Sequence, residues 1–205
     1  MSDPTTSGTP VTGTDDPVRL LARALDRMAA VLDGVRPDQL GLPTPCLTWD
    51  VGTLADHVVH DLAPFTAVAR GERPDWTAPV PATGPDRAPV FRTGAARLLA
   101  AWRAAGDLTG TVRLPVVGTV PARFPVDQQI TEFTVHAWDL RRATDGTAPL
   151  DDEVAEAALR WARTALRDEF RGREVEGKAF GPEQPAPPGA SASDRLAAFT
   201  GRRVG

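Results

Sequence analysis

The sequence predicts an all-α fold, an up-down-down-up bundle of four long helices. Four long segments place apolar residues at the three- and four-residue intervals of an amphipathic helix. Patterns typical of strands are confined to 108–124. The connection from the first helix to the second is short, which favours antiparallel neighbours, whereas the long segment 71–88 lets the third helix run parallel to the second.

The first predicted helix follows Asp15 or Asp16, either of which can cap its N-terminus, and Pro17 is tolerated in its first turn. Its apolar positions continue to about Leu32. Residues 1–14 consist mainly of Ser, Thr, Pro and Gly and cannot bury apolar surface. We therefore expect a disordered tail before the first helix.

The second predicted helix is capped by Asp50 and runs from Val51 to about Ala69. The sequence then predicts, in order, a helix at about 89–105, two short extended pieces around a turn within 108–124, a helix at about 125–144, a helix at about 151–170 and a short helix near 194–200. Residues 15–205 thus form a single helical domain, a four-helix bundle with extra C-terminal helices and a short β-hairpin-like connection.

Composition excludes several classes of function. Apolar residues make up 41% and charged residues 24% of the chain, as in ordinary soluble globular proteins. The net charge of -4 indicates neither a nucleic-acid binder nor a binder of anionic membranes. No apolar run approaches the roughly 20 residues of a membrane span, and no secretory signal begins the chain. Cys46 is the only cysteine, so we expect no internal disulfide and a cytoplasmic location. We further expect a monomer or a homodimer.

Glu132 and His136 are the most informative pair in the sequence. They lie four residues apart and project from the same side of a helix. Their apolar neighbours leave little polar surface, and an enclosed carboxylate requires a metal or another cation. With His57 from the second helix they would form an open, three-ligand site that suits zinc. The alternatives are a solvated surface pair and a partly buried histidine without a metal.

Several neighbouring residues have two interpretations. His60 either reaches the same site or is exposed, and we favour exposure. Asp61 either orients the preceding histidine ring or is solvated. Cys46 is either a catalytic thiol or a buried inert one, and we favour the latter. Asp139 and Arg141 form either a surface ion pair or a contact for a polar ligand.

Five sequence motifs carry a resemblance to a known family. They are Thr44-Pro45-Cys46-x-x-Trp49-Asp50-Val51, Leu54-x-x-His57-Val58-Val59, Glu132-x-x-x-His136-x-Trp138-Asp139-Leu140, Phe180-Gly181-Pro182-Glu183 and Asp194-Arg195-Leu196-x-x-Phe199-x-Gly201-Arg202. Together they resemble the actinobacterial metal-binding proteins related to mycothiol-dependent maleylpyruvate isomerase, which are DinB-like four-helix bundles. The scarcity of Lys, Ile, Asn and Tyr indicates a GC-rich bacterial gene, in agreement.

The resemblance implies a metal held by His57, Glu132 and His136, with mycothiol as a thiol co-substrate in a remaining coordination position. A metal-bound thiol loses its proton and becomes a nucleophile. If His60 also reached the metal, that open position would close. The isomerase itself has a longer C-terminal domain of its own type, so maleylpyruvate is not carried over as the substrate.

The leading hypothesis is thus a divalent-metal enzyme, with zinc as the expected metal, that uses mycothiol for S-transfer or isomerisation of a small electrophile. We assign catalytic roles to Glu132 and Asp61, and thiol binding to Arg141 and Trp138. One alternative is a thiol-independent metal-dependent hydrolase or rearrangement enzyme of specialised metabolism. Another is a metal-binding stress protein without catalysis, and a third is a metal-free bundle with a buried polar cluster.

Overall fold

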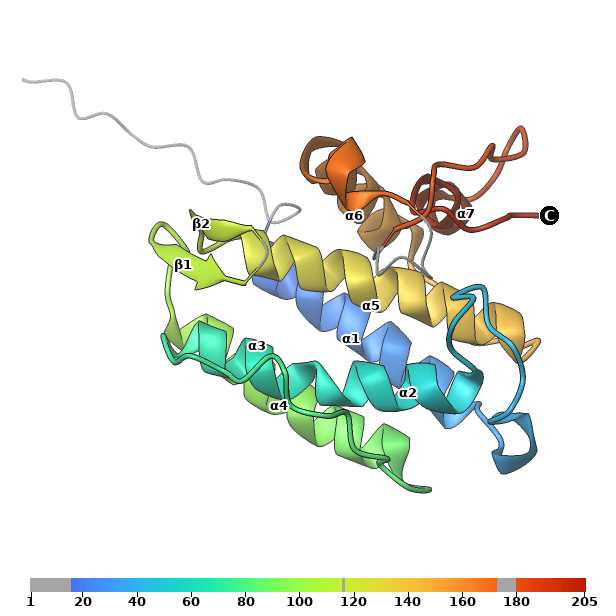
Figure 1. Ribbon diagram of the computed structural model, residues 1–205, viewed down its shortest axis with the longest axis horizontal. Helices are drawn as coiled ribbons and strands as arrows, with labels where there is room; N and C mark the ends of the chain where they lie inside the picture. Colours follow the sequence, from blue (N-terminus) through green and yellow to red (C-terminus); the bar gives the residue numbers. More distant parts are fainter. Residues whose placement is uncertain (1–15, 116, 173–179) are drawn as a thin grey trace, which may run out of the picture.

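The computed structural model describes residues 16–115, 117–172 and 180–205, which form helices and one small β-hairpin (Figure 1). In chain order the helices and strands are α1 (Pro17–Asp33), α2 (Val51–His60), α3 (Leu62–Ala69), α4 (Arg87–Ala104), β1 (Thr111–Leu114), β2 (Gly118–Pro121), α5 (Phe124–Ala143), α6 (Asp152–Ala165) and α7 (Ala192–Phe199). Short 3-10 turns cover Pro37–Gln39 and Asp168–Phe170. The all-α prediction is confirmed, and the predicted tail 1–14 lies outside the described residues.

The helix directions follow the predicted up-down-down-up order. In Figure 1, α1 and α5 run one way along the bundle, whereas α2, α3 and α4 run the other way. The adjacency expected for the first two helices is wrong. In the described part of the chain, α1 packs mainly on α4 and α5, and α2 packs on the same two helices from the opposite side. The connecting segment 34–50 is long enough to cross the end of the bundle to that diagonal position.

The second predicted helix is interrupted at Asp61 and continues as α3. Pro64 lies in the first turn of α3 and has no N–H to donate to the carbonyl of His60, so the helical hydrogen bonding is broken there. The next bond, from the Phe65 N–H to the Asp61 carbonyl, is long at 3.5 Å. The interruption falls directly after the turn that carries His57.

The later elements agree with prediction in type and differ at their ends. β1 and β2 pair antiparallel, with Thr111 opposite Pro121. The helix predicted to reach about residue 170 ends at Ala165. The last helix begins before the predicted residue 194 because the Ser191 side chain caps it, with its Oγ 3.1 Å from the Asp194 N–H.

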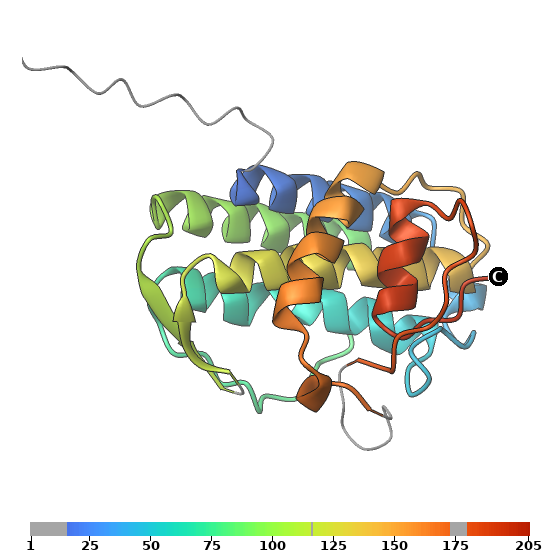
Figure 2. The same ribbon diagram turned by 90° about the horizontal axis from the view of Figure 1, so that it is seen from above.

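α6 and α7 lie side by side over the outer face of α5 (Figures 1 and 2). Arg23 of α1 donates to both carboxylate oxygens of Asp151, the N-cap of α6, at 2.7 and 2.9 Å. The core between the helices includes Leu21, Met28, Leu54, Phe91, Trp102, Ile130, Leu140 and Leu159. Among the described residues, no helix is both long and apolar enough to span a membrane.

Candidate functional site

A cavity of about 980 Å³ opens between α2, α5, the loop before α2 and the C-terminal segments. Its lining includes every residue predicted as a metal ligand or catalytic group. They are His57, Asp61, Glu132 and His136, joined by Cys46, Trp49, Arg142, Arg202 and Arg203. Residues far apart in the sequence therefore meet around one space.

The two helices bring their histidines close together. Glu132 and His136 lie one turn apart on α5, as the spacing predicts. The ring centroids of His57 and His136 are 5.4 Å apart in an edge-to-face arrangement. Trp49, from the loop before α2, stacks obliquely on His57 at 4.4 Å and covers one side of the pair.

Burial shifts the pKa values of three groups at the cavity, His57, Asp61 and Glu132. It lowers the pKa of His57 to about 3, with His136 and His60 adding to the effect, so the imidazole is neutral at pH 7. Burial also raises the pKa of Asp61 well above its usual range, and the charge of Glu132 raises it further. The pKa of Glu132 is raised by burial too, against a 2.9 Å hydrogen bond donated by Gln128 and the field of His136.

This donor set fits a divalent metal. Imidazole nitrogens and carboxylate oxygens are common metal ligands, and two imidazoles and two carboxyl groups line the cavity. Within the described chain, neither Glu132 nor Asp61 forms an ion pair with an arginine or lysine; Asp61 Oδ2 lies 3.5 Å from His57 Nε2. These two half-buried carboxyl groups therefore lack a full cation, and a bound divalent ion would compensate their charge.

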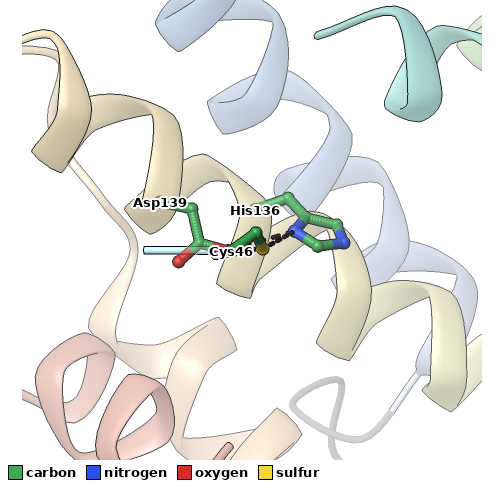
Figure 3. Close-up of side chains that lie close together, drawn as sticks. All are labelled: Cys46, His136 and Asp139. Atoms are coloured by element: carbon green, nitrogen blue, oxygen red, sulfur yellow. Dashed lines mark hydrogen bonds and ion pairs between the residues drawn. The ribbon is translucent and has the colours of Figure 1, made fainter. Parts of the chain in front are cut away.

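A second polar cluster lies behind His136 (Figure 3). Asp139 is fully buried one turn along α5, and its Oδ2 is 3.1 Å from His136 Nδ1. Arg202, from the segment after α7, donates to both Asp139 oxygens at 3.2 and 2.9 Å and to Cys46 Sγ at 3.0 Å. Burial raises the pKa of Asp139, but Arg202 and His136 outweigh it and hold the value at about 2.

The ligand atoms of Cys46, His136 and Asp139 lie within 4.8 Å of one another. Among the described residues, no other group of three His, Cys, Asp or Glu side chains is this close together. This spacing would allow the three side chains to bind a metal ion. However, the Arg202 guanidinium already bonds to two of the three residues and carries the compensating positive charge. The ligand atoms of His57, Glu132 and His136 are more widely spaced, around the cavity.

The residues expected to hold a thiol lie elsewhere. Trp138 and Arg141 line a separate hollow of about 350 Å³, where Trp138 Nε1 donates to Asp194 at 2.8 Å. Arg142 lines both this hollow and the larger cavity. His60, expected to be exposed, is partly buried, and it does not line the larger cavity.

Asp139 and Arg202 were not predicted as site residues. For Asp139 a signal existed, because a residue three positions after His136 lies on nearly the same side of the helix. Its interpretation as a surface ion-pair partner is wrong, since the side chain is fully buried. Arg202 is 63 residues from Asp139, and no local pattern connects them.

Comparison with known proteins is consistent with this geometry. The sequence model described as "Mycothiol maleylpyruvate isomerase N-terminal domain" matches residues 21–141. Two proteins of Mycobacterium tuberculosis, from strains CDC 1551 / Oshkosh and H37Rv and both described as uncharacterized, are 38% identical over 192 residues, covering 92% of this chain and 99% of theirs.

Among solved structures, the crystal structure of the mycothiol-dependent maleylpyruvate isomerase matches with a TM-score of 0.56 and 23% sequence identity. The match covers 72% of this chain and 66% of the isomerase, just under two thirds of its length. At this identity the likeness establishes the DinB-like fold. The sequence match over most of the bundle goes further, and the chain belongs to the family of the mycothiol maleylpyruvate isomerase N-terminal domain.

Proposed function

We propose that this protein is a divalent-metal-dependent enzyme that uses mycothiol to isomerise a small electrophilic substrate or to form an S-linked adduct with it (S-transfer). The observation that carries the proposal is the cavity in which two imidazoles and two half-buried carboxyl groups converge. His57, Glu132 and His136 would hold the metal, for which zinc is the leading candidate. When bound, it would favour the thiolate form of a coordinated thiol at neutral pH.

The chain's own residues would manage protons and positions around the reacting thiol. A thiolate that adds to an activated double bond forms a C–S bond and leaves negative charge on the substrate. Asp61, whose Oδ2 lies 3.5 Å from His57 Nε2, is placed to deliver a proton to the substrate for S-transfer. For isomerisation, the C–S bond breaks after rotation and no net proton is consumed. Glu132, as a ligand, would balance part of the positive charge of the metal.

The part of the thiol remote from sulfur would extend beyond the larger cavity. Arg142 lines both hollows, which supports a continuous binding surface from one to the other. Along that surface Trp138 and Arg141 would contact the thiol carrier. We also propose that the protein is cytoplasmic. We propose that it is a monomer or a homodimer, and light scattering after size exclusion distinguishes these two states.

The test begins with metal. Purified wild type loaded with zinc is expected to retain one ion per chain, and the variants His136→Ala and Glu132→Gln are expected to lose most of it. His60→Ala, on the same helix as His57 but outside the cavity lining, is the matched control. Equal metal content in wild type and His136→Ala would refute the site.

The second step asks for chemistry. Zinc-loaded protein is incubated with mycothiol and a panel of electrophiles bearing activated double bonds, and products are read by mass spectrometry and chromatography. An S-adduct or an isomerised product is expected. The absence of adduct, isomer and mycothiol binding would eliminate the thiol-dependent proposal.

A thiol-independent hydrolase or rearrangement enzyme is the second candidate. It is favoured by Asp61, a half-buried carboxyl group beside His57 that could exchange protons with a water molecule. Metal-dependent turnover that persists after all thiols are removed would select it. Metal retention without any turnover would instead favour a metal-binding stress protein.

A further inference from the structure

Hydrogen bonds within the C-terminal segment fix the position of Arg202, whose side chain contacts α5. Its backbone N–H donates to the Ala197 carbonyl at 2.9 Å, and its Nη1 donates to the Thr200 carbonyl at 2.9 Å. Nε and Nη2 then bond to the two oxygens of Asp139. The guanidinium therefore has a fixed position, and its planar fork matches the carboxylate bidentately.

Asp139 in turn contacts the ring of His136 and limits its orientation. With both oxygens bound to Arg202, the carboxylate can only accept at Oδ2, so His136 Nδ1, 3.1 Å away, carries the ring proton. Figure 3 shows the other ring nitrogen directed away from Asp139 and Cys46. Nε2 is thus left with an unprotonated lone pair, and His136 is one of the residues that line the cavity.

We infer that Arg202 and Asp139 act as positioning residues that set the tautomer and orientation of His136 through the contact chain Arg202–Asp139–His136. The C-terminal segment is then part of the functional site, although Arg202 lies beyond the region 21–141 matched by the family. For the metal, the inference rests on the proposed function; for the ring of His136, it does not.

The cluster with Cys46 supports this assignment over a metal site of its own. Cys46 Sγ is 3.0 Å from Arg202 Nη2 and 3.2 Å from Asp139 Oδ2, but 3.9 Å from His136 Nδ1. The thiol therefore completes the surroundings of the Arg202–Asp139 ion pair. A carboxylate that fixes the second nitrogen of a ligating histidine is the usual arrangement behind metal-binding imidazoles.

The test compares wild type with Arg202→Met and with the double variant Asp139→Leu/Arg202→Met. The double variant removes both charges together, so it leaves no uncompensated buried ion and remains informative if the single variant does not fold. Arg195→Met removes an exposed cation of α7 and is the matched control.

Two readouts are used, and the first needs no metal. Nitrogen-15 NMR of the three histidines in the apoprotein is expected to show His136 as the Nδ1–H tautomer in wild type and Arg195→Met, and a shift towards Nε2–H in the double variant. In the second, chelator competition with zinc alone is expected to show an affinity loss of about 10- to 100-fold.

Unchanged His136 signals together with unchanged zinc affinity in the folded double variant would overturn the inference. If wild type bound no zinc, the proposed metal site would fail, whereas the tautomer of His136 would still decide the role of Arg202 and Asp139. An altered tautomer would then support the inference, and an unaltered one would contradict it.

Discussion

Asp61 is a residue whose ionised form the folded protein disfavours. It sits in the break between α2 and α3, beside His57 and near the charge of Glu132, and both burial and that charge raise its pKa. In the apoprotein the folded state therefore binds a proton more tightly than the unfolded chain does. The resulting stabilisation is present below the unfolded pKa of about 4 and is lost as pH rises through the folded pKa.

Asp61→Asn is therefore expected to stabilise the metal-free protein at pH 8, because it removes a charge that the folded state disfavours. Thermal unfolding by circular dichroism, in chelator, should give a higher Tm than wild type, by about 2–4 °C for each 1 kcal/mol gained. The difference should shrink as pH is lowered towards 4.

Asp26→Asn, at an exposed position of α1, is the control and should leave the pH profile unchanged. A Tm of Asp61→Asn below that of wild type at pH 8 would contradict the conclusion that the folded state disfavours the ionised form of Asp61.

At the scale of elements, the crossing of two loops keeps the C-terminal segment over the cavity. Gly201 has φ +99, and a Cβ there would lie 2.5 Å from the Gly181 Cα. Both glycines line the cavity, and Arg202 follows immediately. Close backbone approach at this crossing therefore determines where the Arg202 guanidinium meets α5.

Gly201→Ala is expected to lower the free energy of unfolding by more than the cost of a left-handed conformation alone. Gly189→Ala isolates that cost, because Gly189 has φ +77 and nothing lies within 4 Å of its added Cβ. We expect about 1–2 kcal/mol for Gly189→Ala and a larger loss for Gly201→Ala in urea denaturation. Equal losses would mean that the two backbones separate freely at the crossing.

Local periodicity explains which parts of this architecture were predictable. Glu132 and His136 lie on one helix, so the helical repeat alone places them together, and the types of the main elements follow from the same rule. The break at Asp61 involves Pro64 and the packing of α2 and α3 against α4, which the apolar period of the segment does not reveal. Arg202 reaches Asp139 only through the tertiary fold, which no local pattern encodes.

For the whole molecule, the contacts between the bundle and its C-terminal helices indicate one cooperative unit. Arg23 joins α1 to the start of α6, and Arg202 joins the segment after α7 to Asp139 of α5. α6 and α7 also pack on each other and on α5. Removing either ion pair should therefore lower the stability of the bundle and of the C-terminal helices α6 and α7 together.

We expect urea unfolding of the metal-free protein to follow a single two-state transition, with coincident curves from far-ultraviolet circular dichroism and tryptophan fluorescence. The tryptophans report on different regions, since Trp49 lies at the cavity, Trp102 in α4 and Trp161 in α6. Arg202→Met should move both curves to lower urea by the same amount, because it leaves Asp139 as an uncompensated buried charge at a cost of about 3–5 kcal/mol. Arg195→Met should move neither curve appreciably. A fluorescence transition that precedes the loss of helix, or a shift in one curve alone, would instead mean that the C-terminal helices unfold as a separate unit and that the Arg202 contact does not couple them to the bundle.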